Sequence, residues 1–203
     1  MLLRDAFTER RSVNFFNPEK EVTDQTLKEI VELAGLAPSA FNLQPWRVIA
    51  VRSEAQKELL SENANKQPKI KEAPVTLIVV GDREGYRPEN SVWAELKAMI
   101  GDEQAQGAID AAGFLYGSSE ERKIKFAESN AGLYAMSIML AAKDLGVDSH
   151  AMSGVDFEGI KKAFNLNASE EVVMLIGLGH YDETKALYPR RTRRSLEEVL
   201  EIV

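Results

Sequence analysis

Two uninterrupted apolar runs constrain the fold of this chain more than any other feature of its sequence. They are APVTLIVVGD at residues 73–82 and EVVMLIGLG at residues 171–179. A strand with one face in water alternates apolar and polar side chains, whereas a short continuous apolar run indicates a strand that is covered on both faces. The chain is therefore expected to place helices around a small central sheet that contains both runs.

Helical periodicity accounts for much of the remaining sequence. Apolar residues from Leu27 to Ala34 recur at the spacing of one helix face, and Thr23 before them is the expected N-cap. Asp156 is the expected N-cap of a later helix. The expected helices are residues 1–10, 23–37, 53–65, 91–112, 120–145 and 157–164, and a further strand is expected at 46–52. The helix at 120–145 is apolar almost all round its centre, so we expect it to be buried.

The expected helices and strands do not follow a strict βαβ order. Residues 147–154 read as a short strand or a loop, and residues 180–194 read as an irregular, basic segment. Helices surrounding a small sheet without that order are typical of the α+β class. The prediction is a single α+β domain over residues 1–203.

Composition excludes several classes of function. The formal charge of −7 argues against a general nucleic-acid binder, which usually carries a basic surface. The chain has no cysteine, so thiolate chemistry is absent, and its two histidines have no metal-ligand spacing, so no metal site is expected and the histidines read as structural. The longest uncharged run, residues 129–142, is shorter than the roughly 20 residues that span a bilayer. With no apolar signal segment near residue 1, we expect a cytoplasmic protein away from membranes.

Two arginine-containing segments indicate an anion site. The first, ERRSVNFF at residues 9–16, places two arginines and a serine where a helix should end, although arginines there can also simply offset the helix dipole. The second, YPRRTRRSLEEV at residues 188–199, has four arginines in five positions. A solvated basic tail is one explanation, and a phosphate clamp is the other, because the guanidinium fork binds phosphate in a bidentate manner.

A third segment, PSAFNLQPW at residues 38–46, combines rigidity with hydrogen-bonding side chains. Pro38 and Pro45 restrict its two ends, and Ser39, Asn42 and Gln44 lie between them. These side chains could simply close turns, but a rigid loop of amides and hydroxyls also suits a heterocycle with donors and acceptors along its edge. Taken together, the three segments favour a ligand with a phosphate at one end and a hydrogen-bonding ring at the other, and flavin mononucleotide (FMN) fits that description.

The chain resembles the nitroreductase family of FMN-dependent NAD(P)H oxidoreductases in the order and spacing of six segments. These segments are RRSVNFF, APSAFNLQPWRVIAV, APVTLIVV, NAGLYAMSIMLAAKDLG, SHAMSGVD and RTRRSLEEV. The resemblance covers nearly the whole chain. It implies a mostly antiparallel central sheet and an intertwined homodimer with FMN at the interface, each site taking residues from both subunits. It also marks residues 83–117 as a possible lid or active-site insertion, with Trp93, Phe114 and Tyr116 either lining it or serving as ordinary core aromatics.

The resemblance also implies which residues bind the cofactor. The N-terminal and C-terminal arginines would hold the phosphate end, residues 38–42 would reach the flavin from the partner subunit, and residues 152–154 would pass its N5 edge. The implied residues are Arg10, Arg11, Ser12, Asn14, Pro38, Ser39, Asn42, Gln67, Met152, Ser153, Gly154, Arg191 and Arg193. Two of them depart from many relatives, since Asn14 replaces a basic residue and Ser153 replaces a glutamate found in some. The first departure leaves Arg10 or Arg11 to offset the charge of the reduced flavin.

The activity implied by the resemblance is hydride transfer from NAD(P)H to flavin N5, followed by transfer to a nitroaromatic, a quinone or a similar acceptor. No catalytic side chain is needed, because the cofactor supplies the chemistry. Three alternatives remain open on the sequence. They are another flavin reaction on the same fold, such as dehalogenation or flavin fragmentation, a flavin-binding protein without turnover, and a structural protein whose basic tail binds a partner.

Overall fold

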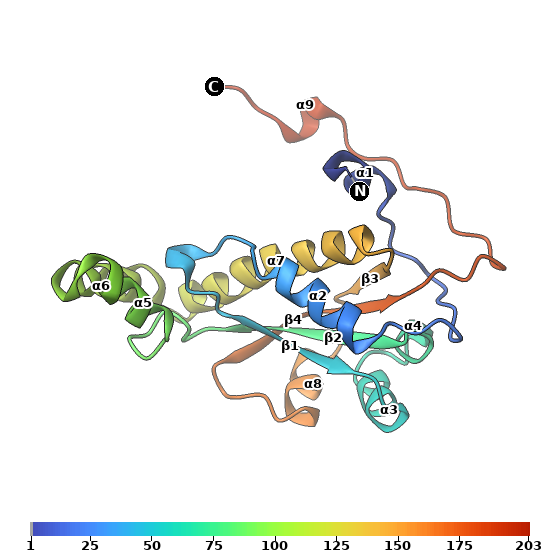
Figure 1. Cartoon of the computed structure of the whole chain (residues 1–203), viewed down its shortest axis with the longest axis horizontal. Coiled ribbons are helices and arrows are strands. Elements are labelled where there is room, and N and C mark those ends of the chain that lie inside the picture. The colour runs from blue at the N-terminus through green and yellow to red at the C-terminus, as the bar shows by residue number, and fades with distance from the viewer. Residues whose placement is uncertain (1) are drawn as a thin grey trace.

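The computed structural model describes residues 2–203, and its central feature there is a four-stranded antiparallel sheet (Figure 1). The strands are β1 (Trp46–Val51), β2 (Val75–Asp82), β3 (Asp148–Met152) and β4 (Glu170–Gly179), in the spatial order β1-β2-β4-β3. All three neighbouring pairs are antiparallel. The α+β class and the small antiparallel sheet predicted from the sequence are therefore confirmed.

The two apolar runs form the inner strands of the sheet, β2 and β4. β2 is buried on both faces from Val75 to Gly81, as the unbroken run predicts. β4 is fully buried only from Leu175 onward. A β-bulge shifts the register between Val79 and Val80 of β2, and the neighbouring residues of β4, such as Met174, are half-buried.

Helices cover both faces of the sheet and enclose two apolar cores. On one face α2 (Asp24–Ala34) and α7 (Glu120–Asp144) pack against Leu77 and Ile176. On the other face α3 (Glu54–Glu62), α4 (Pro68–Glu72) and α8 (Phe157–Ala163) pack against Ile78 and Leu175. Figure 1 shows the two layers above and below the sheet. The short helix α4 was not predicted from the sequence, because five residues are too few for a periodic pattern to emerge.

Both predicted N-caps are confirmed. Thr23 Oγ1 accepts a hydrogen bond from the Thr26 N–H at 3.1 Å, and Asp156 Oδ1 accepts one from the Gly159 N–H at 2.9 Å. Each bond satisfies a backbone donor that a helix leaves unpaired in its first turn. The sequence therefore specified these helix starts through local chemistry alone.

The prediction that α7 is buried all round is wrong for one face. Its inner face crosses β2 so closely that a Cβ on Gly81 would lie 2.8 Å from the Ala127 carbonyl oxygen, a spacing that only glycine allows. Its outer face carries Ile124, Glu128 and Leu133, which are exposed. Among residues 2–203 these side chains stay uncovered, so α7 has apolar residues on both sides and packs with only one.

The predicted helix at 91–112 is instead a pair of helices that project past the end of the sheet (Figure 1). They are α5 (Val92–Ile100) and α6 (Asp102–Gly117), and we call this pair the arm. Gly101 lies between them with φ of 87°, a left-handed conformation that ends the first helix. Trp93 is buried in a cluster at the base of the arm, where its indole N–H donates to the Arg87 carbonyl at 2.9 Å.

The N-terminal helix and the C-terminal segment lie on the same side of the sheet as α7. The helix α1 (Leu3–Glu9) stands beside the C-terminal segment, whose one short helix is α9 (Leu196–Val199) (Figure 1). Every residue from 188 to 203 is exposed, and we call these residues the tail. Among residues 2–203 there is no helix with both the length and the apolarity to cross a membrane.

Candidate functional site

The tail and the residues that follow α1 enclose a cleft of about 610 Å³, which we call the arginine cleft. The residues after α1 run along the edge of the sheet, where Ser12 pairs with Ser149 of β3 and the Val13 N–H donates to the Ser149 carbonyl at 3.1 Å. The lining residues are Arg10, Arg11, Ser12, Asn14, His150, Tyr188, Pro189, Arg190, Arg191, Thr192 and Arg193. The N-terminal and C-terminal arginine segments, nearly the whole chain apart in sequence, therefore meet in space.

Hydrogen bonds from arginine side chains to backbone carbonyl oxygens hold the tail against the N-terminal segment. The Arg11 Nη2 donates to the Tyr188 carbonyl oxygen at 2.5 Å, and the Arg190 Nη2 donates to the Thr8 carbonyl oxygen at 2.6 Å. The rings of Phe15 and Tyr188 also meet edge to face, with their centroids 5.9 Å apart. Two of the five arginines, Arg11 and Arg190, thus hold the walls of the cleft together.

The charge of the arginine cleft is positive and unneutralised. Five arginines line it and no acidic side chain does. Burial lowers the pKa of Arg10, and repulsion from Arg190, Arg193 and Arg11 lowers it further. Within the part of the chain that the structure describes, none of the five arginines forms an ion pair with a carboxylate. Such a cluster in a chain of net charge −7 is suited to a bound anion.

The sequence prediction included six of these lining residues and missed the rest. Arg190 could have been found, since it belongs to the same arginine run as Arg191 and Arg193. His150 was read as structural, and the only signal against that reading was its position two residues before Met152 on one strand. His150 does make a structural contact, because its Nδ1 lies 2.6 Å from the Val13 carbonyl oxygen.

A second group of predicted residues, Gln67, Met152, Ser153 and Gly154, meets just after β3, and Asn65 joins it. The side-chain amides of Asn65 and Gln67 both donate to the Gly154 carbonyl oxygen, at 2.8 Å and 3.2 Å. Ser153 and Gly154 are exposed, whereas the side chain of Met152 is buried in the core under α3 and α8. Only the backbone of Met152 is therefore available to a ligand, together with Ser153 and Gly154.

The third predicted group, the segment between α2 and β1, is rigid and strained. Ser39 Oγ accepts from the Gln44 N–H at 2.9 Å, and the Ala40 N–H donates to Asn130 of α7 at 2.9 Å. Phe41, Asn42 and Gln44 have φ of 50°, 57° and 47°, which is uncommon for residues other than glycine. Such conformations persist only where the surroundings enforce them, and they are concentrated at functional sites.

This segment lies far from the arginine cleft in a single chain. It packs under the arm, where Ala40 and Leu43 join the cluster around Trp93. Figure 1 places it at the arm end of the long axis, whereas the tail turns back at the other end. Pro38, Ser39 and Asn42 therefore do not meet the arginines of their own chain.

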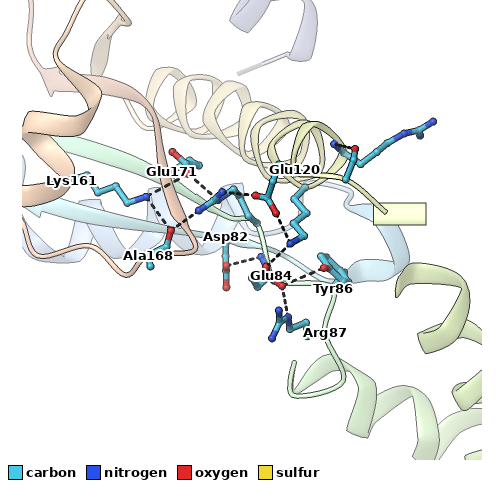
Figure 2. A network of polar contacts seen from close by, with 12 residues as sticks. Asp82, Glu84, Tyr86, Arg87, Glu120, Lys161, Ala168 and Glu171 are labelled. Carbon is cyan, nitrogen blue, oxygen red and sulfur yellow. Dashed lines mark hydrogen bonds and ion pairs between the residues drawn. The ribbon is translucent and has the colours of Figure 1, made fainter. Parts of the chain in front are cut away.

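The base of the arm is held by a network of charged groups (Figure 2). Lys123 of α7 pairs with Glu84 at 3.2 Å and with Glu120 at 2.7 Å. Arg87 also pairs with Glu84. The Arg83 guanidinium lies 2.9 Å from the Glu120 carboxylate and donates a hydrogen bond to the Ala168 carbonyl oxygen at 2.7 Å. Burial alone would raise the pKa of Glu84, but the hydrogen bonds from Lys123 and Arg87 hold it below its ordinary value.

The aromatic residues of the arm have different environments. Trp93 is a core residue, Tyr116 is half-buried and stacks on Phe126 with centroids 4.6 Å apart, and Phe114 is 78% exposed. Of these three, Phe114 is the most accessible to a molecule outside the chain. That the arm acts as a lid over an active site stays a prediction.

The fold and the cleft together define an α+β protein with an arginine-lined anion site, and comparisons with known proteins supply its family. The model of the nitroreductase family matches residues 7–180. MhqN of Bacillus subtilis, whose name assigns it as an NAD(P)H nitroreductase, is 35% identical over 196 residues, which are 95% of each chain. The chain belongs to the nitroreductase family, which is a family of oxidoreductases.

Solved structures agree with this assignment. The nitroreductase YdfN of Bacillus subtilis has a TM-score of 0.92 and 33% identity, with 98% of each chain covered. A nitroreductase of Exiguobacterium sibiricum, solved in complex with FMN, has a TM-score of 0.87 over 100% of this chain and 98% of its own. At 24% identity this second likeness concerns the fold.

Proposed function

We propose that the protein is an FMN-dependent oxidoreductase that transfers a hydride from NAD(P)H to a nitroaromatic, quinone or similar acceptor in a two-step exchange. The observation that carries the proposal is the arginine cleft, with five guanidiniums and no carboxylate among its lining residues. The names of the relatives and the FMN complex of a protein with the same fold support it. Of the reactions possible on this fold, nitroreduction has the support of the sequence relatives.

The residues of this chain fit FMN at both of its ends. Arg191 and Arg193 line the cleft from the tail and would bind the phosphate together with Arg10, which lines it from the segment after α1. Gln67 uses its amide N–H on Gly154, which leaves its carbonyl oxygen to accept from a ring N–H. When bound, FMN would supply the chemistry by accepting a hydride from NAD(P)H and passing electrons to the acceptor.

We also propose that the working unit is a homodimer. Pro38, Ser39 and Asn42 lie at the opposite end of the chain from the arginine cleft, so a second copy would be needed to complete the site. An apolar groove of about 300 Å³ runs between α1, α2 and α7 and is lined by residues that include Leu3, Leu33 and Leu140. The exposed face of α7 and the tail add to the apolar surface that a dimer would bury.

The visible absorption spectrum of the purified protein tests the proposal. FMN should give bands in the blue and near ultraviolet, and anaerobic addition of NADH or NADPH should bleach them. Recovery of the bands on adding a nitroaromatic or a quinone would complete the two-step exchange. Bands that neither nucleotide bleaches would leave a flavin-binding protein without turnover, and no bands after FMN is added would remove the proposal.

A further inference from the structure

His150 is the one lining residue of the arginine cleft whose side chain titrates near neutral pH. It lies in the middle of β3, is half-buried, and faces the cleft together with residues from the N-terminal segment and the tail. The proposed function gives it no role. Its place among five arginines nevertheless makes its protonation state sensitive to whatever binds there.

The contact between His150 and Val13 fixes the tautomer of the imidazole. The Nδ1 atom lies 2.6 Å from the Val13 carbonyl oxygen, and a carbonyl oxygen can only accept a hydrogen bond. Nδ1 therefore carries a proton in both charge states of the ring. Gain or loss of a proton takes place at Nε2, the other ring nitrogen.

The charged groups around His150 come from four parts of the chain. Arg10 and Arg11 follow α1, and Lys69 belongs to α4. The tail contributes Arg190, Arg191 and Arg193. On β3 itself, Asp148 occupies the same face two residues earlier, where it accepts from the Tyr181 N–H at 3.0 Å and lies 3.7 Å from the Lys143 ammonium.

Without a ligand these surroundings disfavour a charged imidazole. Burial lowers the pKa of His150, and repulsion from Lys69 lowers it further, in spite of the bond to Val13. A phosphate monoester carries between one and two negative charges at neutral pH. An opposite charge within about 4–6 Å of the ring favours its protonated form, so an anion held by the cleft arginines would raise the pKa of His150.

We infer that His150 takes up a proton at Nε2 when a phosphate monoester dianion binds in the arginine cleft, so that binding and protonation are coupled. The inference rests on the proposed function, because FMN is the phosphate monoester in question. By linkage, the bound state holds more protons than the free state, so affinity for the dianion rises as pH falls between the two titration midpoints of His150. Within that window the gain is at most about tenfold for each pH unit.

The chain contains only two histidines, so the coupling can be followed directly by NMR. The ring signals of His150 and His180 would be titrated against pH in the flavin-free protein, then with FMN and with inorganic phosphate. His180 lies outside the cleft lining and serves as an internal reference. The titration midpoint of His150 should rise by about one pH unit or more on binding either ligand, while that of His180 should stay within a few tenths.

The matched variant is His150→Gln, whose amide N–H can still donate to Val13 but cannot titrate. Calorimetry of FMN binding near neutral pH in two buffers of different ionisation enthalpy should give lower proton uptake for this variant than for the wild type. The titration of the phosphate group itself is common to both proteins and cancels in the comparison. Equal uptake, or an unmoved His150 midpoint with FMN bound normally, would overturn the inference and leave the proposed function standing. Failure of the wild type to bind FMN would overturn both.

Discussion

At the scale of single residues, the tail arginines differ in what they can do, although they are adjacent in sequence. Arg190 bonds to the Thr8 carbonyl oxygen and so builds the wall of the cleft, whereas Arg191 and Arg193 line the cleft without such a bond. Arg194 belongs to the same run but does not line the cleft. The chain therefore provides its own control for any effect of net charge.

The double variant Arg191→Ala, Arg193→Ala should bind FMN much more weakly than the wild type. Charge-assisted hydrogen bonds contribute roughly 1.5–3 kcal/mol each, so loss of both should raise the dissociation constant by about 10²–10⁴-fold. Flavin fluorescence titration measures this constant. Arg194→Ala, which removes one charge outside the lining, should change it by less than about threefold, because an exposed charge is largely screened. Similar losses of FMN affinity in the two variants would show that net charge, and not a phosphate clamp, accounts for the binding.

Residues could be predicted from the sequence where local chemistry decides their role. Thr23 and Asp156 cap helices because a polar side chain before an apolar period is enough to bond the first turn. The arginine run was recognisable by composition. The cleft role of His150 was not, because it depends on residues 10–14 and the tail lying beside β3, and only the tertiary fold brings these together.

At the scale of elements, the arm is joined to the body by charges at its base rather than by the sheet. Lys123, in the first turns of α7, bonds both Glu120 on its own helix and Glu84, which precedes the arm (Figure 2). Glu84 in turn holds Arg87 and accepts from the Tyr86 hydroxyl at 3.3 Å. The two chain segments that lead into and out of the arm are thus connected by the Lys123 ammonium and by the ion pair between Arg83 and Glu120.

Lys123→Met should loosen the arm and leave the sheet unchanged. Methionine keeps most of the length and the apolar stem of lysine, so the change removes chiefly the charge that links Glu84 to Glu120. Hydrogen exchange of the backbone amides in α5 and α6 should become faster by about tenfold, while exchange in β2 and β4 should not change, since local openings differ between parts of one fold. Lys125→Met is the control, because Lys125 is exposed on the same helix. Equal exchange in both variants would assign the rigidity of the arm to the cluster around Trp93.

The presence of a helix or strand was easier to predict from the sequence than the surroundings in which it lies. The strands β2 and β4 follow from unbroken apolar runs, and α7 follows from its length. The arm was predicted as one helix because Gly101 can occur within a helix or end one, and only its φ of 87° decides between them. The outer face of α7 was predicted to be buried because a sequence records that a residue is apolar without recording which chain covers it.

At the scale of the whole molecule, a single chain leaves its apolar surface and its candidate site incomplete in the same places. After the arginine run the tail carries five apolar residues whose side chains are all more than half exposed within residues 2–203. They are Leu196, Val199, Leu200, Ile202 and Val203. A segment that is apolar, exposed and partly helical is best explained by a partner that covers it, and the proposed second copy offers the groove between α1, α2 and α7.

Deletion of residues 195–203 should therefore weaken the dimer without unfolding the chain. The deleted residues contribute nothing to the cores on either side of the sheet, so circular dichroism and thermal unfolding of the monomer should be preserved. Burial of even one large apolar side chain contributes about 1.5–3 kcal/mol, so the dimer dissociation constant measured by analytical ultracentrifugation should rise by roughly tenfold or more. FMN content should fall with dimer content, because the proposed site takes Asn42 from the second copy. The substitution Glu201→Gln, which alters the charge of the tail and keeps its apolar residues, should leave the dimer intact. A truncated protein that stays fully dimeric and fully loaded with FMN would place the dimer contact on the outer face of α7 instead.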